Sequence, residues 1–329
     1  MSILAPTLQA FFSERLISQH RASAHTIAAY RDAFCLLLGF VERQIGKAPA
    51  ALDIEHLDAK LVGAFLDHLE RDRHNSVRTR NARLAAIHSL FRFAALRHPE
   101  HAALIERVLA IPQKRFEREI VSFLTDEEVE ALLAAPDQRS FLGRRDHALL
   151  LLAIQTGLRV SELTGLSCHD VVLGTGAHVR CSGKGRKERA TPLTATTAAV
   201  LEAWLEERGG EPHHPLFPTR QGTALSRYGV TVLVARHVNV AIEHCPSIVG
   251  KKVSPHVLRH TAAMRLLHAG VDTSVIALWL GHESVATTQI YLHADLSLKE
   301  RALARTAPIG SKPGRYRPPD QLLAFLQGL

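Results

Sequence analysis

A polar segment divides this sequence into two parts. Residues Ile111–Glu119 read IPQKRFERE, with a proline near the start, many charged side chains and no apolar face that a core would bury. Such a segment is typical of an interdomain linker, and 329 residues suffice for two domains with separate cores. The expected organisation is a first domain over 1–110, a linker over 111–120, a second domain over 121–307 and a tail over 308–329.

The first part of the chain carries helical periodicity. Its apolar residues recur at helical spacing in four blocks, Leu8–Ile17, Thr26–Gln44, Leu57–Arg71 and Val77–Arg97. We expect Thr26 to cap the second block, and Pro49–Asp53 breaks the pattern before the third. A small all-helical domain is therefore predicted.

The second part mixes helical and extended patterns. Thr125, followed three residues later by Glu128, forms a capping box that opens a helix. Two short extended runs, His178–Ser182 and Glu188–Leu193, flank the glycine-containing turn Gly183–Lys187 and predict a hairpin. The remainder reads as mainly helical. The predicted fold class is mainly α with a small antiparallel β-sheet, in a helical domain followed by a mixed α/β domain.

Charge and cysteine usage narrow the class of protein. A formal charge of +8 and a pI near 9.6 suit a surface that binds a polyanion, although a merely basic protein has the same balance. The cysteines are scattered, without the spacing of a zinc site or disulfide framework, and read as reduced thiols: Cys35, Cys168, Cys181 and Cys245. The sequence has neither a secretory signal pattern nor an apolar run of membrane-spanning length, so we expect a cytoplasmic protein with no membrane partner.

Arg159 stands directly after an apolar helical stretch that is interrupted at Gly157. A helix end can hold a guanidinium rigidly, as a phosphate-binding site requires. The competing interpretation is structural, because Glu162 lies three residues further on and can pair with the arginine.

A second group of candidates begins a helix. Ser254–Pro255 are suited to the cap and to the first helical position, and the spacing of three puts His256 and Arg259 on one face. His260 shares that face, so an H-x-x-x-H zinc pair is an alternative. The glutamate of the H-E-x-x-H pattern is replaced by Val257, and a structural hydrogen bond is the preferred role of His260.

Two further candidates lie near the C-terminal end. Gly281 is placed to end a helix, which leaves His282 at a turn that can face a cleft. Tyr291 follows nine residues later. Taken alone, such a tyrosine is more often a packing residue with its hydroxyl at the surface.

The order of these motifs, R…GKG…HxxRH…GH…Y, resembles the tyrosine recombinase (phage integrase-like) family from about Thr125 to Arg305. The N-terminal helices are more weakly similar to its SAM-like core-binding domain. The resemblance implies catalytic residues at every position of the family's pattern, with Glu162 in support: Arg159, Lys184, His256, Arg259, His282 and Tyr291. Within the family, the sequence after the tyrosine resembles integrases of bacterial mobile elements more than Xer recombinases.

The chemistry implied is transesterification at a DNA phosphodiester. Tyr291 would attack phosphorus and form a 3′-phosphotyrosyl link, while Arg159 and Arg259 clamp the phosphoryl oxygens. Lys184 would protonate the leaving 5′-oxygen, with Lys187 as the rival on the same loop. His256 would assist proton transfer at the tyrosine, and His282 would hydrogen-bond the phosphate. The family's reaction needs neither a metal nor another cofactor.

DNA contacts are also expected outside the catalytic motifs. The fourth helical block and the linker carry the residues expected to contact DNA: Arg78, Arg80, Asn81, Arg83, Lys114 and Arg115. A solvated cationic helix face is the alternative interpretation of the first four.

The expected partners are double-stranded recombination sites, three further protomers in a tetramer on synapsed DNA, and accessory recombinases. After the Pro- and Gly-rich stretch 308–319, an apolar cluster could dock as a short helix in the same or a neighbouring protomer: Leu322, Leu323, Phe325 and Leu326. The expected location is the cytoplasm, at the bacterial nucleoid. A type IB topoisomerase, an Xer-like dimer-resolving recombinase and a non-catalytic DNA-binding regulator remain alternatives.

Overall fold

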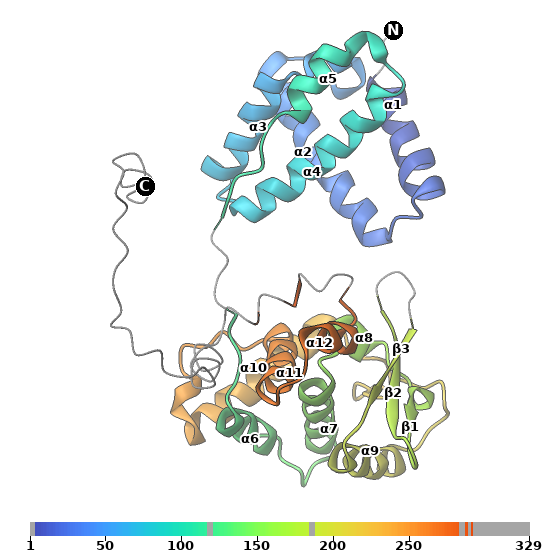
Figure 1. The fold of residues 1–329 in the computed structure, drawn as a ribbon, viewed down its shortest axis with the longest axis vertical. Helices are drawn as coiled ribbons and strands as arrows, with labels where there is room; N and C mark the ends of the chain where they lie inside the picture. The colour runs from blue at the N-terminus through green and yellow to red at the C-terminus, as the bar shows by residue number, and fades with distance from the viewer. Residues whose placement is uncertain (1–3, 117–120, 184–187, 283–286, 289–290, 292–329) are drawn as a thin grey trace, which may run out of the picture. The chain divides into compact units, whose positions relative to one another are not determined.

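The chain forms two compact units, Met1–Arg118 and Glu119–Leu329, as Figure 1 illustrates. This computed structural model describes residues 4–116, 121–183, 188–282, 287, 288 and 291. Each unit is built around its own cluster of buried apolar side chains. The predicted C-terminal helix and its docking contact lie outside the described residues.

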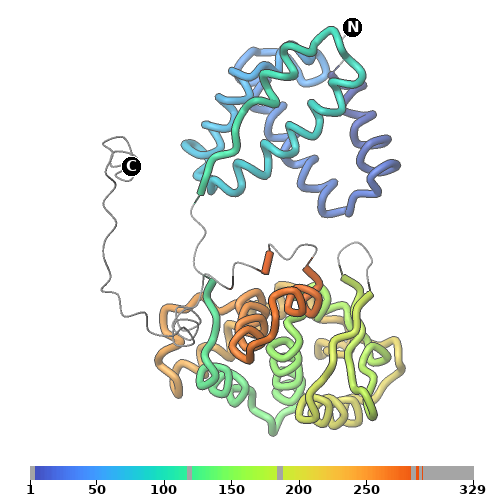
Figure 2. The backbone as a smooth tube through the Cα atoms, in the orientation of Figure 1, coloured from blue at the N-terminus to red at the C-terminus, as the bar shows by residue number. Residues whose placement is uncertain are grey.

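In its described residues, the first unit contains helices only. Its α-helices are α1 (Leu4–Ala10), α2 (Ala24–Ile45), α3 (Ala59–Arg71), α4 (Val77–Ala95) and α5 (Ala102–Leu109). A π-helical segment, η1 (Phe11–Gln19), and three 3-10 segments connect them, η2 (Pro49–Ala51), η3 (Ile54–His56) and η4 (Pro99–His101). Figure 2 traces this bundle in blue and teal. The four predicted blocks correspond to α1 with η1, α2, α3 and α4, whereas α5 is not among the predicted helices.

Helix α2 contributes one face to this unit's core. The hydroxyl of Ser23 accepts a hydrogen bond from the backbone N–H of Thr26 and caps the helix, so the prediction that Thr26 is the cap is wrong by three residues. Among the described helices, α2 alone is long and apolar enough to suit a membrane span. It nevertheless packs one face into the unit's core, as a core helix does, through Ala33, Phe34, Leu37, Phe40 and Val41.

The second unit combines helices with one small sheet. Its α-helices are α6 (Asp126–Ala134), α7 (Phe141–Thr156), α8 (Val160–Thr164), α9 (Ala195–Arg208), α10 (Arg227–His244), α11 (Pro255–His268) and α12 (Thr273–Leu280). Short 3-10 segments lie at η5 (Cys168–Asp170) and η7 (Pro246–Ile248). The strands are β1 (Val171–Val172), β2 (His178–Ser182) and β3 (Glu188–Pro192).

The three strands form an antiparallel sheet in the order β1-β2-β3. Val179 pairs with Thr191 and Ser182 with Glu188, which confirms the predicted hairpin. Figure 1 shows this sheet at one edge of the unit, beside α8 and α9. The predicted class, mainly α with a small antiparallel sheet, is therefore confirmed.

Local sequence signals determine where the helices around the site begin. The Thr125 and Glu128 side chains form the predicted capping box at the start of α6. Helix α11 begins as predicted, because the hydroxyl of Ser254 accepts from the N–H of Val257 and Pro255 occupies the first position. Glycines with left-handed backbone end α7 at Gly157 and α12 at Gly281.

Candidate active site

Arg159 links the start of α8 to the end of α12. It stands at the N-cap of α8, where its backbone N–H donates to the Glu162 carboxylate at 2.7 Å. Its guanidinium donates to the same carboxylate at 2.9 Å and to the carbonyl of Gly281 at 2.9 Å. The ion pair foreseen as a purely structural alternative is therefore present. The Arg159 side chain is 32% exposed, so the ion pair holds it in place without burying it completely.

Arg259 is held by two helix ends and is almost completely buried, with 3% of its surface exposed. One guanidinium nitrogen donates to the carbonyl of Gly157 and another to that of Leu280, each at 2.7 Å. Burial, with the nearby charge of Arg159, lowers the pKa of Arg259 to about 10. The side chain remains a cation at neutral pH.

The glycine at the end of α7 allows this close packing. The backbone of Gly157 has φ +65°, which favours glycine. A Cβ at this position would lie 2.5 Å from Cδ2 of Leu280 and 3.1 Å from Cβ of Ala262. Gly157 thus brings its own carbonyl within reach of Arg259, because no side chain separates α7 from α11 and α12.

Tyr291 lies in the interior of the unit, only 1% exposed, in a small core with Met264 and Leu280. Its hydroxyl is hydrogen-bonded to Nδ1 of His260 at 3.0 Å. The structural hydrogen bond expected for His260 is thus made to the candidate nucleophile itself. Burial raises the pKa of Tyr291, and burial with the nearby His256 lowers that of His260 to about 4.

Two more imidazoles belong to this cluster, one against His260 and the other against Tyr291. The rings of His256 and His260 meet edge to face with centroids 4.2 Å apart. The ring of His282 lies nearly parallel to that of Tyr291 at 6.4 Å, and its Nδ1 is 2.8 Å from the hydroxyl oxygen of Thr288. Burial, followed by the charge of Arg259, lowers the pKa of His282 to about 4. His260 and His282 are therefore both neutral at pH 7.

An arginine that the sequence analysis did not single out belongs to this cluster. Arg189, on β3, donates to both oxygens of Glu162 at 3.0 and 2.8 Å. Although burial opposes it, the hydrogen bonds from Arg189 and Arg159 lower the pKa of Glu162. No local sequence signal links Arg189 to Glu162, because the two are far apart in sequence and the strand has no distinctive motif. Lys184 and its rival Lys187 lie outside the described residues.

The zinc alternative for His256 and His260 finds no third ligand in the described part of the chain. Within residues 4–116, 121–183, 188–282, 287, 288 and 291, no group of three or more His, Cys, Asp or Glu is placed to hold a metal ion.

Two residues expected to face DNA are instead buried in the first unit. Arg80 and Asn81 are 5% and 7% exposed. Asn81 forms two hydrogen bonds with the backbone of Lys114, accepting from its N–H at 3.1 Å and donating to its carbonyl at 2.8 Å. Arg80 donates to the carbonyl of Pro112 at 3.1 Å. In this structure both residues fasten the linker to α4, which corrects the expectation of a DNA-facing stripe at these positions.

The other expected DNA contacts differ in accessibility. Arg78 and Arg115 are exposed, while Arg83 is partly buried and burial lowers its pKa. Lys114 extends from the fastened linker to the Glu70 carboxylate at 2.6 Å. Exposed cations for a polyanion therefore remain at Arg78 and Arg115.

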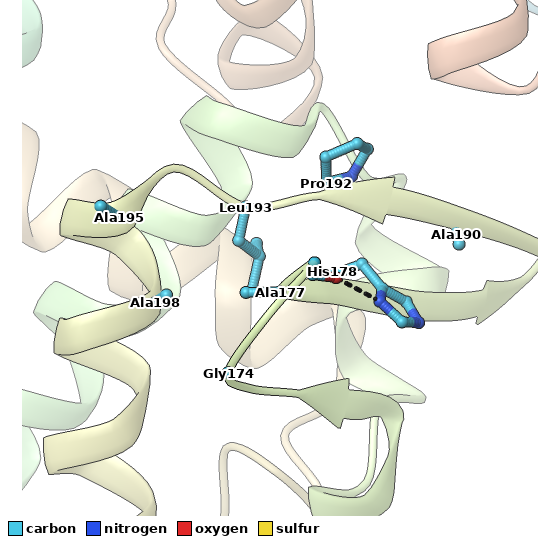
Figure 3. A pocket seen from close by; sticks show the side chains of 9 residues that line it. Gly174, Ala177, His178, Ala190, Pro192, Leu193, Ala195 and Ala198 are labelled. Carbon is cyan, nitrogen blue, oxygen red and sulfur yellow. Dashed lines mark hydrogen bonds between the residues drawn. The ribbon is translucent and has the colours of Figure 1, made fainter.

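A hollow of about 610 Å³ lies elsewhere in the second unit, between the sheet and the start of α9. Figure 3 shows it lined by small and apolar side chains such as Ala177, Pro192 and Leu193, with His178 bonded to the carbonyl of Gly176. None of the residues expected to act on DNA lines it. The candidate active site is thus the arginine and histidine cluster around Tyr291, and the hollow is separate from it.

Comparison with known proteins assigns both units to families. Residues 122–297 match the phage integrase family, and residues 9–98 match the phage integrase N-terminal SAM-like domain. An integrase/recombinase of Sinorhizobium fredii, y4rC, is 57% identical over 326 residues, covering 99% of this chain and 98% of that protein. The tyrosine recombinase XerC of Pelobacter propionicus is 34% identical over 288 residues, covering 87% of this chain and 90% of the relative.

A solved structure shares the fold over most of the chain. It is the XerH site-specific recombinase bound to palindromic difH substrate in a post-cleavage complex. The TM-score is 0.69 at 23% identity, over 91% of this chain and 84% of the other.

Proposed function

The chain belongs to the phage integrase family of tyrosine recombinases, and on that premise we propose that it breaks and rejoins DNA at specific sites through Tyr291. The reaction is a transesterification. The tyrosine oxygen bonds to phosphorus, a 3′-phosphotyrosyl link forms, and the 5′-hydroxyl leaves. Attack by a 5′-hydroxyl of another strand reverses these steps and releases the enzyme.

The observation that carries this proposal is the convergence of two arginines and two neutral imidazoles on one tyrosine. Arg159 and Arg259 both donate to carbonyls at the C-terminal end of α12, Gly281 and Leu280. The same turn continues into His282, whose ring lies over Tyr291. Residues far apart in sequence are thus assembled around a single phenol, an arrangement that a DNA-binding regulator does not need.

The two arginines suit a phosphodiester in the transition state. Negative charge accumulates on the non-bridging oxygens, and planar guanidiniums bind two oxygens at once. Because both side chains are already fixed by protein carbonyls, little reorganisation is needed when charge develops. We assign phosphate binding to Arg159, Arg259 and His282.

Proton transfer requires a donor and an acceptor. His256 and His260 lie on the tyrosine side, and we assign His256 to assist removal of the phenolic proton. Lys184, by its place in the family pattern, protonates the leaving 5′-oxygen. Tyr291 as a whole residue is 1% exposed, so we infer that it leaves its hydrogen bond to His260 before it attacks phosphorus in DNA.

The partner is double-stranded DNA at recombination sites. The assembly we propose is a tetramer on two synapsed duplexes, since exchange between two duplexes requires four cleavages, with the apolar segment near Leu322 as the intersubunit contact. Accessory recombinases are further candidate partners. The identity of 57% to the S. fredii integrase/recombinase, against 34% to XerC, favours an integrase over an Xer recombinase. A mobile element is the DNA that we propose it integrates. Such a protein acts in the cytoplasm on nucleoid DNA.

A covalent-adduct assay tests the function. Wild-type protein is incubated with nicked suicide duplexes taken from the flanks of its gene, without divalent metal, and the products are separated on a denaturing gel. We expect an adduct from wild-type protein and from Tyr228→Phe, which removes the hydroxyl of a 77% exposed residue, and none from Tyr291→Phe. An adduct that persists in Tyr291→Phe refutes the assignment. Tight site-specific binding without any adduct favours the regulator.

Strand exchange then separates the remaining enzyme classes. Two labelled duplexes that yield recombinant products support a recombinase, whereas relaxation of supercoils without exchange supports a type IB topoisomerase.

A further inference from the structure

We propose that Arg189 is a positioning residue, which acts through Glu162 to hold Arg159 in the orientation that binds the scissile phosphate. This inference rests on the proposed function and adds a residue that the family pattern of the sequence does not include.

Glu162 is shared evenly between the two arginines. Oε1 accepts from Nη1 of Arg159 at 2.9 Å and from Nη1 of Arg189 at 3.0 Å. Oε2 accepts from the backbone N–H of Arg159 at 2.7 Å and from Nη2 of Arg189 at 2.8 Å. Each carboxylate oxygen therefore accepts two hydrogen bonds, one from Arg159 and one from Arg189. The two arginines together fix the plane of the carboxylate.

Arg189 also fits closely against the turn that Arg159 contacts. A Cβ on Gly281 would lie 2.6 Å from Nη1 of Arg189, so this glycine leaves room for the guanidinium. The carbonyl of the same glycine accepts from Arg159, and His282 follows it. Arg189 thus packs against the peptide that positions two groups assigned to phosphate binding.

The rest of the environment indicates that Glu162 determines where Arg189 lies. The Nε atom of Arg189 is buried and has no hydrogen-bond partner among the described residues, which is unfavourable for a polar donor. The side chain is 13% exposed and makes a bidentate contact with Glu162, which offsets the unfavourable burial of Nε. A lysine would retain the charge at this position but could not contact both oxygens in a planar fork.

If the contact is lost, Arg159 is the one arginine among the described residues that still binds Glu162, and the carboxylate is held from one side alone. A displacement of about 1 Å in a phosphate-binding group can cost about 100-fold in rate. We therefore expect Arg189→Lys to slow adduct formation by about 10- to 100-fold while leaving affinity for DNA nearly unchanged. Arg180→Lys is the matched control, because Arg180 lies on the neighbouring strand β2 and donates to the backbone carbonyl of His169.

The decisive readout is a neutral substrate. Once the wild-type protein has mapped the scissile position, a methylphosphonate placed there removes the charge that Arg159 is assigned to bind. The Arg189→Lys defect should then shrink to within about threefold, since an interaction made only with the transition-state charge no longer contributes. A variant that is merely less well folded would lose the same factor on both substrates.

A double-mutant cycle with Glu162→Ala, which removes both carboxylate oxygens, provides a second measure. If Arg189 acts through Glu162, the double variant cleaves no more slowly than Glu162→Ala alone, because the contact is already broken. Provided that wild-type protein forms its Tyr291 adduct, three results overturn this inference. They are a wild-type rate of adduct formation in Arg189→Lys, an equal loss of rate on the charged and neutral substrates, and rate losses that multiply in the double-mutant cycle. Absence of that adduct overturns the proposed function, and this inference with it.

Discussion

Nδ1 of His260 lies 3.0 Å from the hydroxyl oxygen of Tyr291, so the proposed nucleophile is hydrogen-bonded to a neutral imidazole. With a pKa of about 4, His260 is a very weak base, while burial raises the pKa of the phenol above its usual 10. Transfer of the proton from the phenol to the imidazole is therefore unfavourable in this environment. The contact therefore keeps Tyr291 protonated until the surroundings change.

The buried imidazoles predict a pH dependence of stability. Their pKa values of about 4 in the folded chain lie below the unfolded value near 6.5, so the unfolded chain binds more protons between these limits. Stability should fall as the pH falls from about 6.5 towards 4. His260→Asn should lose less stability than wild type between pH 7 and pH 5 in urea unfolding. His244→Asn, on an exposed residue of α10, should keep the wild-type slope, and an unchanged slope in both variants contradicts the burial argument.

Arg259→Lys should nearly abolish cleavage. An ammonium cannot reach the carbonyls of Gly157 and Leu280 together and still present a planar face to a phosphate. We expect at least about a 1,000-fold loss in adduct formation with DNA binding retained. Arg265→Lys is the control on the same helix, where an exposed guanidinium lies 3.3 Å from Asp126. Cleavage within tenfold of wild type in Arg259→Lys would remove this residue from the phosphate site.

Asn81→Ala should destabilise the first unit. It leaves the backbone N–H and carbonyl of Lys114 without their partner, at a cost of about 1–3 kcal/mol. Both tryptophans lie in the second unit, so circular dichroism or hydrogen exchange is the appropriate measurement and tryptophan fluorescence is not. Arg78→Ala should leave stability unchanged and weaken DNA binding. The slope of the logarithm of the binding constant against the logarithm of the salt concentration should become smaller in magnitude by about 1. If Asn81→Ala instead weakened DNA binding and left the stability of the first unit unchanged, Asn81 would again be a candidate DNA contact.

Two glycines separate backbone strain from packing. Gly46 and Gly157 both end helices with left-handed backbone, but a Cβ meets nothing within 4 Å at Gly46 and crowds Leu280 at Gly157. Alanine at either should cost about 1 kcal/mol for the backbone, and at Gly157 an additional 1–3 kcal/mol, roughly, for overpacking. Gly157→Ala should also slow cleavage, because it displaces the carbonyl that holds Arg259. Equal losses in unfolding free energy would show that the packing at Gly157 can relax.

Signals confined to a few residues predicted the fold well. The Thr125 capping box, the start of α11 at Pro255 and the strands around the lysine loop depend on neighbours in sequence, and each is present in the structure. The candidate site residues Arg159, Arg259 and Tyr291 stand in motifs whose order is distinctive, and their roles on DNA stay predictions. The cap of α2 was misplaced because Ser23 and Thr26 both carry hydroxyls and differ only by one helical turn.

Contacts between distant residues could not be predicted. Arg80 and Asn81 read as a cationic helix face, and only the path of the linker back over α4 shows that they are buried. Arg189 became part of the site because β3 brings it to Glu162, and nothing in the composition of the strand indicates a partner on α8. In each case a polar residue has its partner far along the chain, where periodicity carries no information.

The use of peptide carbonyls at the end of α12 has an electrostatic consequence. The C-terminal end of a helix dipole carries roughly half a negative charge, so it can hold a guanidinium without neutralising it. Arg159, Arg189 and Arg259 have a single carboxylate, Glu162, among their hydrogen-bond partners in the described residues. The cluster consequently keeps a net positive charge in a partly buried environment. A phosphodiester that enters it supplies the missing negative charge.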